Sequence, residues 1–154
     1  MPDLKRCFES AGFSEVLTVL GSGNVVFSVR TAPVEGLARR AEKAMHSELG
    51  RSFNTIIRPT QYLHDLIAAE PFAGFDLPAT AKRVVTFLRQ PTESSVTLPI
   101  ERDGASILKL AAAEVFSAYV PNEKGPEFMN LLERTFGKDI TTRTFETVQK
   151  CARA

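Results

Sequence analysis

The stretch LGSGNVVFSV, residues 20–29, decides how the first half of this chain is expected to fold. Its glycines and asparagine adopt positive φ at low cost, and an alternating run of β-forming residues follows them. A second short apolar run, residues 16–20, precedes the glycines. The pattern predicts a β-hairpin with its turn at residues 21–24. A nucleophilic role for Ser22 would need G-x-S-x-G spacing between a strand and a helix, which this stretch lacks.

Elements on either side of the hairpin suggest a known supersecondary unit. We expect a helix over residues 1–11, a helix over 34–49 that ends at Gly50, and a strand over 53–58. The order helix, strand, strand, helix, strand matches a ferredoxin-like βαββαβ unit that lacks its first strand. That strand would lie in the middle of the sheet. We therefore expect either a missing upstream segment of about twenty residues, or a second chain or C-terminal segment that supplies the central pairing.

The second half of the chain follows a similar rhythm. The expected elements are a strand at 84–88, a helix or loop at 91–98, a hairpin at 107–111 and 115–120, and helices at 126–136 and 143–152. The loop that runs from Glu70 to Pro78 is rich in turn residues, and it predicts a boundary between the halves. The sequence thus predicts an α+β fold of two small subdomains, residues 1–74 and 75–154.

Composition excludes several classes of protein. The chain has 154 residues, a net charge of +1 and 44% hydrophobic residues, which is typical of a globular protein without a strong global field for nucleic acid. No apolar run is long enough to span a membrane, and the first ten residues carry no signal-peptide core. The two cysteines, Cys7 and Cys151, have no metal-ligand spacing and are expected to be reduced thiols. These features predict a cytoplasmic protein without membrane association.

Catalytic and metal-binding patterns are weak. The two histidines, His46 and His64, fall on different predicted helices without carboxylates in ligand spacing. The carboxylates lie mainly on helix exteriors, where a charge is usually solvated. We therefore predict no metal, no cofactor and no catalytic residues. The leading hypothesis is a non-catalytic binding or interaction protein.

Two ligand hypotheses remain open. The first is a small anionic ligand between the subdomains, held by Ser22 and Asn24 of the hairpin turn and by Thr142 and Arg143 at a predicted helix start. The second is single-stranded nucleic acid, stacked on the face of the first sheet. The residues that would bind it are Phe27, Arg30 and Arg58. The RNP1 pattern of RNA-binding sheets is missing, and a phenylalanine in so apolar a strand is more often a core residue.

Several motifs together resemble a bacterial family, number sixteen ninety-seven in the domain-of-unknown-function series. They are GSGNVVF with its following helix, Glu70-Pro71-Phe72, Tyr119-Val120-Pro121-Asn122, and Thr141-Thr142-Arg143 leading into Thr147-Val148. The resemblance covers nearly the whole chain. It implies two α+β subdomains, the first ferredoxin-like, preceded by a strand of the type FLRGINVGG that this chain lacks. It implies no chemistry.

Overall fold

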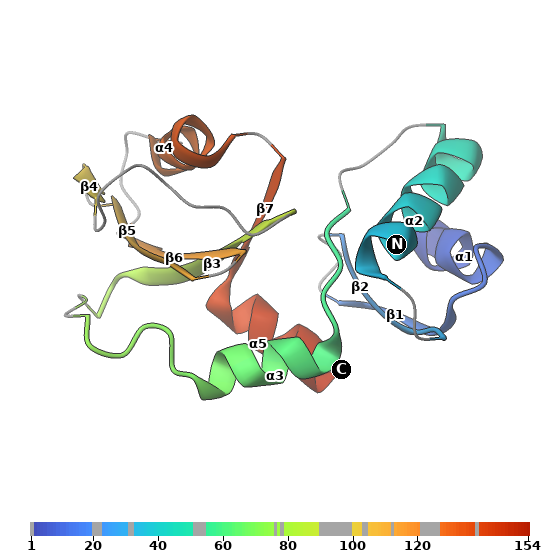
Figure 1. Cartoon of the computed structure of the whole chain (residues 1–154), viewed down its shortest axis with the longest axis horizontal. Helices are drawn as coiled ribbons and strands as arrows, with labels where there is room; N and C mark the ends of the chain where they lie inside the picture. The colour runs from blue at the N-terminus through green and yellow to red at the C-terminus, as the bar shows by residue number, and fades with distance from the viewer. Residues whose placement is uncertain are drawn as a thin grey trace. The chain divides into compact units, whose positions relative to one another are not determined.

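The computed structural model describes residues 2–19, 23–30, 33–50, 55–75, 77, 79–89, 100–102, 105–111, 113–120, 127–137 and 139–154. Within them, five helices and seven strands form an α+β fold with two antiparallel sheets (Figure 1), which confirms the predicted fold class. By its contacts the chain divides into two compact units. The first comprises Met1–Asp65 with Gln149–Ala154, and the second comprises Leu66–Val148. The predicted subdomains 1–74 and 75–154 stay a prediction.

The first unit is built on the predicted hairpin. Strand β1 (Ser14–Val19) pairs antiparallel with β2 (Asn24–Ser28), and Leu17 lies opposite Val26. Gly23 adopts a φ of 86°, which glycine tolerates because it has no Cβ. Two helices accompany the hairpin, α1 (Pro2–Ser10) and α2 (Val34–Leu49). Helix α1 packs against both β1 and α2, and Figure 1 shows both helices on the same side of the hairpin.

The core of the first unit lies between these helices and the hairpin. Helix α2 contributes a stripe of residues at helical spacing, namely Leu37, Ala38, Ala41 and Met45, and ends at Gly50 with a φ of 76°. Three phenylalanine rings complete the core, since Phe13 lies 5.4 Å from Phe8 and 4.4 Å from Phe27 between ring centroids. Val25 and Phe27 therefore face this core.

The strand predicted at residues 53–58 is not formed over its described part. Residues 51–54 lie outside the described residues, and residues 55–59 belong to no strand. The side chain of Ile57 nevertheless packs against the core of the first unit. A strand needs a neighbour to pair with, and the described part of this sheet contains only β1 and β2.

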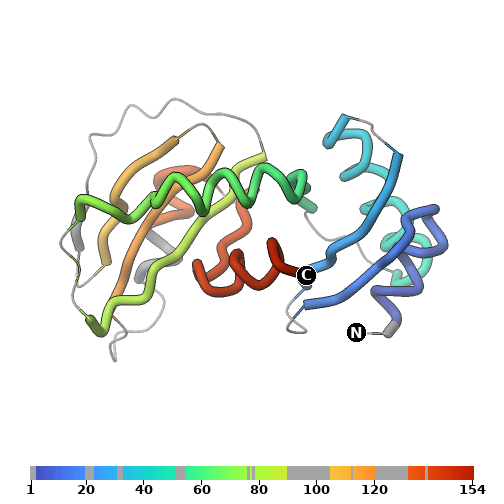
Figure 2. The backbone as a smooth tube through the Cα atoms, turned by 90° about the horizontal axis from the view of Figure 1, so that it is seen from below, coloured from blue at the N-terminus to red at the C-terminus, as the bar shows by residue number. Residues whose placement is uncertain are grey.

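The second unit contains a five-stranded antiparallel sheet in the order β4-β5-β6-β3-β7. Its strands are β3 (Lys82–Leu88), β4 (Ile100–Arg102), β5 (Ala105–Ala111), β6 (Glu114–Tyr119) and β7 (Ile140–Thr144). Strands β3, β5 and β6 confirm the predictions, whereas β4 has no counterpart among the predicted elements. The helix or loop predicted at 91–98 lies outside the described residues. In Figure 2 the strands of this sheet run beside one another.

Three more helices are α3 (Thr60–Ala68), α4 (Glu127–Phe136) and α5 (Phe145–Arg153). The helix start predicted at Thr142 and Arg143 is wrong, because both residues lie in β7 and α5 begins at Phe145. Pairing with β3 decides the backbone there, since Thr142 lies opposite Thr86. Leu132 of α4 is fully buried with Val84 and Val115 of the sheet.

Candidate functional site

The ends and edges of the two sheets differ in how they are protected from pairing with another strand. An edge strand is usually blocked by a charge, a bulge, a proline or by being very short. At one edge of the five-stranded sheet, β4 has three residues. At the other edge, Arg143 of β7 donates from Nη1 to the carbonyl of Thr142 at 2.9 Å. Both described edges of this sheet therefore have a feature that hinders pairing, namely the shortness of β4 and the charge of Arg143 on β7.

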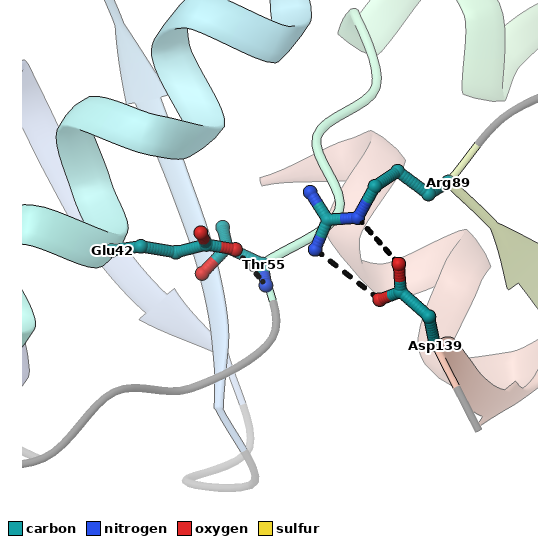
Figure 3. Close-up of polar contacts among 4 residues, drawn as sticks. All are labelled: Glu42, Thr55, Arg89 and Asp139. Atoms are coloured by element: carbon teal, nitrogen blue, oxygen red, sulfur yellow. Dashed lines mark hydrogen bonds and ion pairs between the residues drawn. The ribbon is translucent and has the colours of Figure 1, made fainter.

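A salt bridge also ties β7 to the strand beside it. Arg89 follows β3, and Asp139 precedes β7. The guanidinium donates to both carboxylate oxygens of Asp139, with Nε 2.8 Å from Oδ2 and Nη2 3.3 Å from Oδ1 (Figure 3). A bidentate pair fixes geometry better than a single contact does. The pair holds the start of β7 in register with the end of β3.

In the first unit the two edges are unequal. Strand β1 has an irregular register between Ser14 and Leu17, and Glu15 there adopts a φ of 50°. A charged residue at an irregularity of an edge strand hinders a further strand from pairing with that edge. Strand β2 reads NVVFS, with no charge, no proline and a regular register from Asn24 to Val26. Among the described edge strands, β2 alone has none of these devices. We call its outer side the β2 edge.

The polar side chains of β2 bond back toward β1. Asn24 donates from Nδ2 to the carbonyl of Val19 at 3.2 Å, and Ser28 donates from Oγ to Oε2 of Glu15 at 2.9 Å. Val26, between them, lies on the face away from the core with Leu17, a residue that is 52% exposed. The β2 edge therefore presents backbone groups bordered by valine and phenylalanine.

Residues 55–59 are a further segment of the first unit, and their Ile57 packs on the same core. The amide of Thr55 donates to Oε1 of Glu42 on α2 at 2.9 Å (Figure 3). The carbonyl of Ile57 accepts from Nη1 of Arg58 at 3.1 Å, and the guanidinium of Arg58 lies 5.8 Å from the Tyr62 ring centroid. Side chains thus satisfy backbone groups that a neighbouring strand would satisfy in a sheet.

The residues predicted to hold an anion are engaged in bonds within separate units. Ser22 lies outside the described residues. Asn24 belongs to the first unit, where it bonds to Val19. Thr142 belongs to the second unit, and its hydroxyl lies 2.9 Å from that of Thr86, while Arg143 donates to the Thr142 carbonyl. Each described candidate therefore has a structural role of its own.

The three residues predicted to bind nucleic acid lie at separate places in the first unit. The ring of Phe27 is half-buried against Phe8 and Phe13, so the face of this ring is not offered to a base. Arg30 is exposed beyond the end of β2, and Arg58 is half-buried beside Tyr62. These three side chains do not form a stacking platform.

Groups that could support chemistry are few in the described part of the chain. Cys7 is fully buried, and burial, with Glu48 nearby, raises the pKa of its thiol. Within the described ranges, no three His, Cys, Asp or Glu side chains gather as metal ligands do. In the same ranges, no helix has the length and apolar character that crossing a membrane requires.

Sequence reasoning predicted an open edge in the first sheet, because the missing strand would lie in its middle, but it did not name residues 24–28 as a binding site. The uncharged run NVVFS was visible in the sequence. The devices on the other edges were not, since the positive φ of Glu15 and the bond from Arg143 to the Thr142 carbonyl appear only in the folded chain.

Comparisons with known proteins bear on the fold. The model of a family described as "Protein of unknown function (DUF1697)" matches residues 1–116. One similar solved structure is that of the conserved bacterial protein SP0830 from Streptococcus pneumoniae, with a TM-score of 0.70 and 17% sequence identity. The similarity covers 99% of this chain and 87% of that one, and it shows a shared fold. No curated protein matches the chain.

Proposed function

The chain belongs to the DUF1697 family of proteins of unknown function, and we propose that this member is a non-catalytic interaction module. It binds an extended segment of a partner along the β2 edge. Strand addition is a common mode of peptide recognition, in which main-chain hydrogen bonds provide affinity and alternate side chains provide specificity. The observation that carries this proposal is the unprotected β2 edge in a sheet of only two described strands.

Energetics favour an added strand at this place. A two-stranded sheet is marginal by itself and gains stability from a third strand or from helices on its face. Each new main-chain hydrogen bond contributes about 1 kcal/mol net. An added strand would also cover the apolar side chains that border the β2 edge, including Phe27.

The described chemistry of the first unit supports a non-catalytic role. Of the two thiols in this unit, Cys151 is half-buried, and Cys7 is buried with a raised pKa, which disfavours its reactive thiolate. The polar groups of β2 bond to β1 and are held in structural contacts. A partner would therefore bind to the main-chain groups of β2.

The test uses a neutral probe peptide, acetyl-Thr-Val-Thr-Val-Thr-amide, titrated into isotopically labelled protein and followed by amide NMR. The expected result is a shift of the β2 amides and of residues 55–59, while the amides of β7 stay unchanged. The control peptide, acetyl-Thr-Val-Pro-Val-Thr-amide, interrupts the main-chain ladder and is expected to bind much more weakly. Unchanged β2 amides at millimolar probe would refute the proposal.

Two proline variants sharpen the test. In an antiparallel pair, adjacent residues point their N–H groups alternately toward the partner strand and away from it. Of Val25→Pro and Val26→Pro, one therefore removes a bond to β1 and the other removes a donor of the outer edge. We expect one variant to lose stability and the other to fold but lose the probe. Two folded variants that both keep the probe would contradict binding at this edge.

The small-anion and nucleic-acid hypotheses are weaker candidates within the same proposal. Thr142 and Arg143 would have to exchange their present bonds for a ligand, and Phe27 would have to leave the core. Titration with inorganic phosphate tests the first hypothesis. A short oligonucleotide tests the second, because its affinity must fall steeply with salt.

A further inference from the structure

We draw no further inference here: the strongest candidate, the apolar face of the β1–β2 hairpin where the exposed Leu17 lies opposite Val26, carries none, because nothing in the described part of the chain shows what covers it.

Discussion

Replacing Gly12 by alanine should destabilise the first unit through two separable effects. Gly12 connects α1 to β1 with a φ of 94°, a conformation that alanine adopts only at a cost. A Cβ at this position would also collide with Nη2 of Arg40. Arg40 currently donates from Nε to the carbonyl of Ala11 at 2.6 Å, and its guanidinium carbon lies 4.6 Å from the Phe13 ring centroid. Gly12→Ala would therefore strain the backbone and displace Arg40.

The magnitude follows from these contacts. A left-handed alanine costs about 1–2 kcal/mol. Loss of the bond from Arg40 to Ala11 costs about 1 kcal/mol, and loss of the exposed cation–π contact with Phe13 costs about 0.5–1 kcal/mol. The expected loss is about 2.5–4 kcal/mol, a large fraction of the 5–15 kcal/mol by which domains are typically stable.

Urea unfolding followed by circular dichroism measures this loss in a double-mutant cycle. In an Arg40→Ala background the collision is gone, so Gly12→Ala should cost only the backbone term of about 1–2 kcal/mol. Gly36→Ala is the matched control, since Gly36 lies inside α2, where an added Cβ would meet nothing within 4 Å, and it should stabilise by about 0.5–1 kcal/mol. An equal cost of Gly12→Ala in both backgrounds would refute the role given to Arg40.

Three further predictions concern buried groups and are checked by the same unfolding measurements. Thr86→Val removes the hydroxyl that lies 2.9 Å from that of Thr142 and should cost about 1 kcal/mol. Ser117→Ala removes a buried hydroxyl without a partner among the described residues, so it should be neutral or stabilising, and a loss above about 1 kcal/mol would contradict this. Burial raises the pKa of Cys7, so the unfolded thiol ionises first. Stability should then fall as pH rises above about 8.5, and Cys7→Ala should flatten that decline.

Local patterns in the sequence determined several elements of this fold. The hairpin at Gly23 follows from turn residues between short β-forming runs, and the structure places β1 and β2 there. Helix α2 follows from an apolar stripe that ends at Gly50, and β3, β5 and β6 follow from short apolar runs. These elements could be predicted because their signals lie within a few residues of the structure that they specify.

Contacts between distant residues decided the rest. Thr142 lies in a strand because β3 pairs with it at Thr86, and its local sequence also suits a helix start. Phe27 faces a core built by α1 and α2, and this placement gave the β2 edge its apolar border. Residues 55–59 have strand-forming composition but belong to no strand, because pairing requires a neighbour and not only a propensity. The sequence therefore determined the elements that are specified locally, and only the tertiary structure decided which strand edge was left unprotected, because edge protection depends on pairing between distant segments.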